Sequence, residues 1–450
     1  MSTPFTPSRR TLLAGGLGIA AGAVGLSACG SKAPSSSGPA GSGKPASNPS
    51  AVPSGDASAK VTISFMEAMS SGTQKTALAK MTQDFMTANP NITVDLQEQP
   101  DYGTLQTKIS AQTAAGKPPT IAQVYEDWAA EYAEAQVIVP LDAYIAQAQQ
   151  YEDFYDGIKA DLQLPDGKTW MWPFNKSVVV VYYNTDMVKK VPATWDEFAQ
   201  VAKSVSNGKV VALSVDPGSS SSPAGGTALF EIISEAFGDP VFAKDGTPQF
   251  TKPGVVKALQ YFVDLKKAGA LALGKNYPGQ TALGSQTGAF DISSVASYPY
   301  DLASAGKKFT MGVAQLPTGP GGKQANQLAG TNVALFAAAD DNQKAAAWKY
   351  MQFLTEPAQQ AYWSAQTGYL PVCQEALQQP DFKAYAKKTP FVTRASAQLN
   401  SASALPPVKW INACSGYLSV AITEAVTQGK DPVAALQTAQ ADALKAQKQG

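Results

Sequence analysis

The chain has 450 residues, of which 44% are hydrophobic, so it is long enough to fill the cores of two or three domains. It carries 35 Lys and Arg against 35 Asp and Glu, a balance that does not favour a nucleic acid or an anionic membrane surface as partner. It contains no histidine, which excludes Ser-His-Asp hydrolysis, histidine-ligated zinc and histidine acid/base chemistry.

Residues 1–28 have the pattern of an export signal. The twin arginines Arg9-Arg10 precede a run of 17 residues, Leu12–Ala28, that has no charge and is rich in Gly and Ala. A membrane-spanning helix needs about 20 apolar residues, so this shorter run predicts a twin-arginine signal peptide. The run ends in Leu-Ser-Ala-Cys29, which resembles a bacterial lipobox and predicts lipidation of Cys29. The alternative is an ordinary buried cysteine.

These features predict an exported lipoprotein that is anchored to the outer face of the cell membrane. Residues 29–59 are mainly Ser, Gly, Pro and Ala, with almost no apolar side chains. Such a segment cannot bury enough surface to offset its ordering entropy, so we expect a disordered tether.

The first folded segment, residues 61–98, predicts a β-α-β unit. Residues 61–65 alternate between apolar and polar, three apolar residues repeat at helical spacing from Leu78 to Phe85, and residues 92–96 alternate again. In such units ligands bind beyond the carboxyl ends of the strands, where helix N-termini present free N–H groups. We therefore expect part of a ligand site at this edge of the sheet.

A short predicted strand, Ile121–Tyr125, is followed by Glu126, Asp127 and Trp128 in the same topological position. An acidic pair beside an aromatic residue suits the recognition of hydroxyl groups, because carboxylates accept hydrogen bonds and the aromatic face covers C–H surface. The alternative is that Asp127 caps the following helix and Trp128 packs in the core.

The segment Trp172–Asn184 contains four valines and two tyrosines in an unbroken run. This composition predicts a strand that is buried on both faces. Strands and helices alternate before it and again after it. We therefore expect this strand to carry the chain from one α/β lobe into a second.

The second half begins with the capping box Thr194–Glu197 and turns mainly helical beyond Asp340. Strands are predicted at residues 210–215, 289–292, 309–316 and 333–336. Ser293 and Ser294 end the second of these strands, and Gly330-Thr331-Asn332 precedes the last. We interpret the last two strands as a return to the first lobe.

Two further cysteines, Cys373 and Cys414, are candidates for a disulfide because the protein is expected to be exported. Such a bond would close a loop of about 40 residues and contribute roughly 4 kcal/mol by the chain-entropy relation. The alternative is two separate buried thiols.

Several short motifs together resemble the extracellular solute-binding proteins of ABC importers, family 1, in the group that binds sugars and glycerol phosphates. Within that group the chain looks most similar to the glycerol-3-phosphate-binding proteins. The motifs are Pro119–Glu126, Pro173–Val178, Tyr182-Tyr183-Asn184 and Thr367–Pro371. The resemblance covers the chain from Val61 to its end.

The resemblance implies an α/β, two-lobed periplasmic-binding-protein-like fold of type II, with mixed sheets flanked by helices and a ligand cleft between the lobes. Lobe 1 would comprise residues 61–172 and 305–355, and lobe 2 residues 173–304 and 356–450. The family's ligand contacts would fall on Tyr102, Glu126, Ser177, Ser293 or Ser294, Gly330 and Tyr369. Tyr102 and Tyr369 would cover or hydrogen-bond the ligand from opposite lobes, and Glu126 would accept from its hydroxyls.

Two departures bear on the ligand. The glycerol-phosphate binders of the family use an arginine where this chain reads Leu405–Trp410, and here Lys409 offers only a point charge. The region Gly225–Thr227 also lacks the family's aromatic residue. A neutral sugar or a glycerophosphodiester is therefore as plausible a ligand as glycerol 3-phosphate.

The resemblance implies a monomeric binding protein, not an enzyme, that needs no cofactor or metal. Its partners would be the small-molecule solute, ABC permease subunits with their ATPase, and the membrane through the lipid anchor. The competing hypothesis is a lipid-anchored glycoside hydrolase that uses paired carboxylates such as Glu126 with Asp127 or Asp291.

Overall fold

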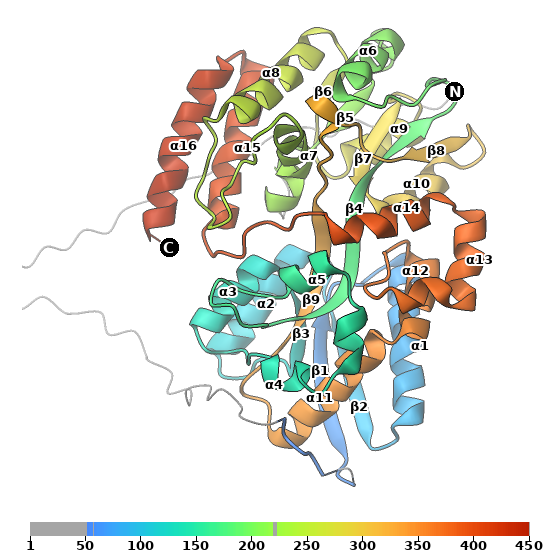
Figure 1. Ribbon diagram of the computed structural model, residues 1–450, viewed down its shortest axis with the longest axis vertical. Helices are drawn as coiled ribbons and strands as arrows, with labels where there is room; N and C mark the ends of the chain where they lie inside the picture. The colour runs from blue at the N-terminus through green and yellow to red at the C-terminus, as the bar shows by residue number, and fades with distance from the viewer. Residues whose placement is uncertain (1–51, 57, 219–222, 450) are drawn as a thin grey trace, which may run out of the picture. The chain divides into compact units, whose positions relative to one another are not determined.

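Figure 1 shows the computed structural model of the chain, which describes residues 52–56, 58–218 and 223–449. The predicted signal peptide, the lipidation site Cys29 and most of the tether 29–59 lie outside these residues. None of the helices in this part of the chain has the length and apolar character needed to cross a membrane.

One mixed sheet organises the fold, with strands in the order β2-β1-β3-β9-β4-β7-β5-β6 and with β8 paired to β4 off this path. β1 is parallel to β2 and β3, and β5 is parallel to β6 and β7, whereas β4 and β9 run antiparallel to their neighbours. The strands are β1 (Val61–Glu67), β2 (Ile92–Glu98), β3 (Ile121–Val124), β4 (Trp172–Asn184), β5 (Leu213–Val215), β6 (Leu271–Leu273), β7 (Phe290–Ser294), β8 (Met311–Ala314) and β9 (Leu328–Leu335).

Helices flank the sheet on both sides and also form the C-terminal part of the chain (Figure 1). The α-helices are α1 (Gly72–Ala88), α2 (Tyr102–Ala114), α3 (Glu126–Glu134), α4 (Asp142–Ile145), α5 (Asp156–Asp161), α6 (Trp195–Val205), α7 (Pro223–Ala236), α8 (Pro253–Lys267), α9 (Pro278–Gly284), α10 (Tyr298–Ala305), α11 (Asp341–Leu354), α12 (Pro357–Thr367), α13 (Pro380–Lys388), α14 (Phe391–Ala397), α15 (Ile411–Gln428) and α16 (Pro432–Gln449). Short 3₁₀ turns are η1 (Gln149–Asp153), η2 (Val295–Ser297), η3 (Pro320–Gly322), η4 (Glu375–Gln378) and η5 (Gln398–Asn400).

The strand β4 belongs to both parts of the sheet. Its first portion, Trp172–Val178, pairs with β9, and its second portion, Val179–Asn184, pairs with β7 and β8. All but one of its 13 residues are buried, as the run of valines and tyrosines predicts. Because β4 is common to both groups of strands, it is the main covalent and hydrogen-bonded link between them.

Two large hydrophobic cores lie along this link, and the first also includes Val180 and Tyr182 of β4 and residues of α9, η2 and α10. The core of the first lobe gathers aromatic residues of β1, α1, β4, α11 and α12, including Phe65, Phe85, Trp172, Tyr350 and Trp363. Met66 and Ala122 face a smaller cluster on the other side of β1 and β3, because successive strand residues point to opposite faces. The core of the second lobe gathers residues of α6, α7, α8, β7, α15 and α16.

The structure differs from the sequence-based division of lobes at two places. That division assigns residues 305–355 to lobe 1, but β8 pairs with the second portion of β4, as β7 does. The second difference is the segment from α12 to η5. That division places residues 356–450 in lobe 2, but Trp363, Phe382 and Val392 are buried in the core of the first lobe. Trp363 packs on Phe174 of β4 with ring centroids 5.2 Å apart. The chain joins the core of the second lobe at Val408. Hydrophobic periodicity predicts that these helices have an apolar face, but it does not say which core receives that face.

The predicted disulfide between Cys373 and Cys414 is not formed, because the two cysteines are buried in different lobes. The Cys373 thiol lies 3.7 Å from the carbonyl oxygen of Thr355, and the Cys414 thiol lies 3.5 Å from that of Ala443. Burial raises the pKa of Cys373 to about 12 and that of Cys414 to about 11. Both thiols are therefore protonated and poorly reactive at neutral pH.

We expect thiol titration to count two cysteines in a variant that lacks Cys29, once it is unfolded without reductant. The folded protein should react slowly, since both thiols are buried and protonated. A thiol count of zero in the unfolded chain would instead show that the two cysteines are joined.

A substitution at Gly330 tests whether the backbone of β9 lies close against that of β4. Its φ of 99° lies in the left-handed region, and a Cβ at this position would lie 1.7 Å from the carbonyl oxygen of Asn175. Gly330→Ala should therefore lower the free energy of unfolding by roughly 2 to 5 kcal/mol, from backbone strain and overlap together. Gly321→Ala is the matched control, because Gly321 has φ 69° but no neighbour within 4 Å of the added Cβ. Chemical denaturation that shows equal losses for the two variants would contradict the overlap.

Candidate ligand-binding site

Glu126 and Asp127 begin helix α3 directly after β3, as the motif predicts. Carboxylates are favoured there, since the first turn of a helix presents unpaired N–H groups and the positive end of the dipole. Asp127 does not cap the helix; it accepts a hydrogen bond from Asn412 of α15. Trp128 is buried and packs on Tyr125 with ring centroids 5.1 Å apart. Trp128 thus takes the structural role that the sequence left as an alternative.

Two of the predicted ligand contacts, Tyr102 and Tyr369, lie together beside β4 in the first lobe, so the prediction that they contact the ligand from opposite lobes is wrong. Tyr102 begins α2, which Asp101 caps by accepting a hydrogen bond of 2.8 Å from Thr104 N. Tyr369 follows the left-handed C-cap Gly368 of α12, and the next residue, Leu370, donates a 2.8 Å backbone hydrogen bond to Lys176. The Tyr102 hydroxyl accepts a 3.3 Å hydrogen bond from Asn175 Nδ2, and each of the two phenols shifts the pKa of the other, so they lie close together.

Aromatic rings extend this tyrosine pair in both directions. Tyr102 packs edge-on against Tyr125 at 5.2 Å between centroids, and Tyr369 stacks on Trp363 at 5.9 Å. Burial raises the pKa of Tyr102 and Tyr125 well above the usual value, so both phenols are neutral at physiological pH. A neutral phenol both donates and accepts hydrogen bonds, and its ring covers apolar C–H groups.

A buried network of charges lies next to these aromatic rings. The Lys176 ammonium is 0% exposed and contacts Asp161 Oδ2 at 2.5 Å and Glu126 Oε1 at 3.3 Å. Asn332 Nδ2 donates to the same two oxygens, at 2.8 Å and 3.0 Å. Burial lowers the pKa of Lys176, but the charges of Asp161 and Glu126 more than compensate. The pKa of Lys176 is therefore raised overall. Lys176 is therefore a positive charge that two carboxyl groups surround.

The predicted contacts Ser177 and Gly330 lie on the ladder between β4 and β9. Ser177 is buried opposite Ala329, and Gly330 lies opposite Lys176. Nearby, Asn175 Oδ1 accepts hydrogen bonds from Gln123 at 3.1 Å and from Thr331 at 2.6 Å. This network fixes the backbone on which Lys176 and Tyr369 sit.

Ser293 and Ser294 lie on β7, in the second lobe. The Ser293 hydroxyl donates to Asp291 Oδ2 at 2.7 Å, and the Ser294 hydroxyl accepts from Ala296 N at 3.1 Å. Both hydroxyls thus make local contacts. The predicted set divides into one group around Glu126 and the two tyrosines, and a second group on β7.

Two tyrosines of the second lobe approach the first group, and the sequence analysis did not select either of them. The Tyr300 hydroxyl would be 3.3 Å from a Cβ on Gly72, at the start of α1. Tyr277 is 75% exposed, has φ 58°, and its charge would raise the pKa values of Tyr125 and Tyr369. A non-glycine residue rarely adopts a left-handed backbone without a reason, and here it presents an aromatic ring to solvent.

The network residues Lys176, Asp161 and Asn332 were also missed. One signal was present in the sequence, because Lys176 lies inside a run that is predicted to be buried on both faces. A lysine is almost never fully buried unless it is paired, so partners of opposite charge were to be expected. The sequence did not identify these partners, since no local pattern joins Lys176 to Asp161, 15 residues earlier, or Glu126 to Asn332, 206 residues later.

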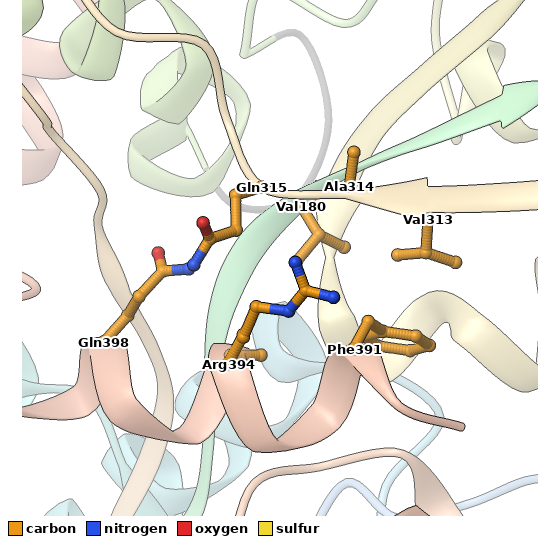
Figure 2. Close-up of a pocket in the computed structure, with 8 residues that line it drawn as sticks. Val180, Val313, Ala314, Gln315, Phe391, Arg394 and Gln398 are labelled. Carbon is orange, nitrogen blue, oxygen red and sulfur yellow. The ribbon is translucent and has the colours of Figure 1, made fainter. Parts of the chain in front are cut away.

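Figure 2 shows a pocket on different elements, lined by Val180 of β4, Val313 and Ala314 of β8, Gln315, and Phe391, Arg394, Ala395 and Gln398 around α14. Its volume of about 40 Å³ is far below the roughly 300 Å³ of a typical small-molecule site. Arg394 is the only arginine after Arg10. The sole arginine of the described residues therefore lines this small pocket.

Comparisons with known proteins agree with this architecture. A family model described as "Bacterial extracellular solute-binding protein" matches residues 80–390. The sn-glycerol-3-phosphate-binding periplasmic protein UgpB of Escherichia coli K12 is 27% identical over 388 residues, which cover 79% of this chain and 84% of that protein.

Solved structures show the same fold. UgpB from Mycobacterium tuberculosis, in complex with glycerophosphocholine, has a TM-score of 0.77 at 22% identity, covering 86% of this chain and 99% of that one. The cyclic alpha-maltosyl-1,6-maltose binding protein from Arthrobacter globiformis has a TM-score of 0.75 at 21% identity, covering 87% and 100%. The predicted type II binding-protein fold is thus confirmed. The chain belongs to the bacterial extracellular solute-binding protein family, the solute-binding components of ABC importers.

Proposed function

We propose that this protein captures a neutral or zwitterionic polyol solute, such as a sugar or a glycerophosphodiester, between its two lobes and delivers it unchanged to an ABC permease. We propose further that it acts as a monomer anchored through a lipid on Cys29. The observation that carries the ligand assignment is the grouping of Tyr102, Tyr369 and Glu126 in the first lobe, with Tyr277 and Tyr300 approaching from the second.

The chemistry of this grouping suits a polyol. Tyrosine rings cover the C–H faces of sugars and glycerol, while the phenols and the Glu126 carboxyl exchange hydrogen bonds with oxygens. The relatives support this range of ligands, since UgpB of E. coli is named for sn-glycerol 3-phosphate, and the similar solved structures hold glycerophosphocholine or are named for a cyclic maltosyl-maltose.

The positive charges argue against a phosphate monoester. Lys176 is surrounded by two carboxyl groups, and Lys409, the candidate phosphate ligand, is paired with Glu134 at 2.8 Å. Arg394 lines the separate pocket of Figure 2. Recognition of a dianion usually needs a guanidinium fork or several N–H donors, and these residues do not supply them beside Tyr102 and Tyr369.

The carboxylates do not support the hydrolase alternative. Glu126 and Asp161 contact the same ammonium group, Asp127 accepts from Asn412, and Asp291 accepts from Ser293. Each acid is engaged by a protein donor, whereas a glycosidase needs two acids that face each other across a bond of the sugar. The matched family and the similar structures are binding proteins rather than enzymes.

Motion of one lobe against the other would turn on β4, which pairs with β9 in the first lobe and with β7 and β8 in the second. A solute that contacts both lobes binds the closed arrangement more tightly than the open one. This difference in affinity drives closure.

Calorimetric titration with glycerophosphocholine, maltose and sn-glycerol 3-phosphate tests the proposal. We expect saturable binding of one of the two solutes without net charge, at least tenfold tighter than that of the phosphate monoester, with no product on prolonged incubation. Tightest binding of the monoester would contradict the ligand class. Release of product would favour the hydrolase.

Tyr277 provides a test of the second lobe's contribution. Tyr277→Ala should weaken binding of the tightest solute in that panel by roughly fivefold, because a stacking contact is worth about 1 kcal/mol. Tyr417→Ala is the control, since Tyr417 is also exposed, at 37%, but lies on α15. Equal affinities of the two variants would remove Tyr277 from the site.

A further inference from the structure

Two carboxyl groups share a single ammonium group beside the tyrosine pair. The side chains of Lys176 and Asp161 are 0% and 1% exposed, and that of Glu126 is 13% exposed. With both acids ionised, the three residues would carry a net negative charge out of water. Two like charges in such a place are costly, and one acid commonly keeps its proton instead.

The contacts indicate which acid is ionised. Asp161 Oδ2 lies closer to both donors than Glu126 Oε1 does: 2.5 Å against 3.3 Å from Lys176, and 2.8 Å against 3.0 Å from Asn332. Hydrogen bonds to an ionised carboxylate are the shorter ones. The geometry therefore places the negative charge on Asp161.

Lys176 and Asn332 both donate to Glu126 Oε1, and no side chain of the described residues donates to Glu126 Oε2. Asp161 Oδ1 also lacks a donor, but it is buried, whereas the Glu126 side chain is partly exposed. Glu126 is also the most exposed member of the cluster and begins α3 next to the tyrosines. An acid in this position can keep Oε1 toward the cluster and carry a proton on Oε2.

We propose that Glu126 is a neutral carboxylic acid in the native protein and meets the solute as a hydrogen-bond donor, with Lys176, Asp161 and Asn332 as the positioning residues that keep it neutral. The solute would then present an acceptor oxygen at this point, such as a hydroxyl, a ring ether or a phosphodiester oxygen. This reverses the role expected from the sequence, in which Glu126 accepts from hydroxyls. The donor role of Glu126 toward the solute rests on the proposed function, whereas its protonation state does not depend on that function.

The environment of Glu126 also favours its neutral form. Burial, followed by the charge of Asp161, raises the pKa of Glu126 well above its usual value, and Lys176 opposes only part of this shift. The titratable groups facing Glu126 are Asp161 of α5, Lys176 of β4, and its neighbours Tyr125 and Asp127. Burial raises the pKa of Asp127 to about 7, so Asp127 adds a pH dependence of its own.

The protonation is tested by unfolding experiments between pH 5 and 8.5 on the wild type and on Glu126→Gln, which imitates the neutral acid. If the folded pKa of Glu126 is raised, its contribution to wild-type stability is fully present at low pH and is lost as pH rises toward that pKa. The unfolding equilibrium constants of the two proteins should be similar at pH 5. Their ratio should then move in favour of Glu126→Gln by up to tenfold per pH unit. Asp127 is present in both proteins, so its titration cancels in the ratio.

Asp161→Asn is the matched control. It removes the ionised partner of Lys176, and we expect it to be less stable than the wild type across the whole pH range. If Glu126→Gln instead behaves like Asp161→Asn, with a deficit across the whole pH range, or does not fold, then Glu126 is an ionised partner and the proposal is overturned. An infrared band of a protonated carboxyl group at pH 7, present in the wild type and absent in Glu126→Gln, would support it independently.

The role toward the solute is tested with glycerophosphocholine and maltose as probes. The amide of Glu126→Gln still offers an N–H donor, so its affinity should stay within about threefold of the wild type at pH 6 and should lose the wild type's weakening at higher pH. A loss of more than tenfold at pH 6, together with the expected unfolding profile, would overturn the donor role but not the protonation. Absence of binding by the wild type would refute the proposed function, and the unfolding profile would still decide the protonation.

Discussion

The buried ammonium of Lys176 is the constraint on which the candidate site depends. Its desolvation would cost several kcal/mol if no opposite charge were near, so the fold must bring acids to it. Asp161 comes from α5, Glu126 from the start of α3, and Asn332 from β9. One charge on β4 thereby fixes the relative position of three other elements of the first lobe, and Tyr369 is fixed to the same residue through the hydrogen bond from Leu370.

The strand β4 carries a second constraint, because it is shared by the two groups of strands. The β9 backbone must lie close against Asn175 and Lys176, and Gly330 permits that approach. Beyond Val178 the same strand enters the second lobe, where it pairs with β7 and β8. The residues that hold the site rigid and the residues about which the lobes would turn are therefore neighbours on one strand, so the site residues of the first lobe can stay in place while the second lobe moves.

Much of this arrangement was predictable from local pattern. The crossing strand Trp172–Asn184, the β-α-β unit at the start and the position of Glu126 after a strand all follow from hydrophobic periodicity and chain order. The packing of α12 to η5 on the first lobe was not predictable, since an apolar helix face fits either core. The same limit applies to the two cysteines. Their spacing in the sequence permits a disulfide bond, but their burial in separate cores prevents it. The members of the site that come together only through folding were not predictable, as Asp161 and Asn332 beside Lys176 show.

The distribution of charge bears on the proposed selectivity among related solutes. Lys409 lies where the family's arginine was expected, but its pair with Glu134 is partly exposed, with side chains 33% and 64% exposed, and such pairs are weak. This pair therefore contributes only weakly to the exclusion of an anion. The nearby contact between Asp127 and Asn412 works against an anion, since the pKa of Asp127 is about 7 and the residue carries part of a negative charge at neutral pH. A dianion near α15 would meet that charge, whereas a hydroxyl or a phosphodiester would meet less repulsion. Specificity of this kind comes from an unfavourable contact with the wrong solute as much as from favourable contacts with the right one.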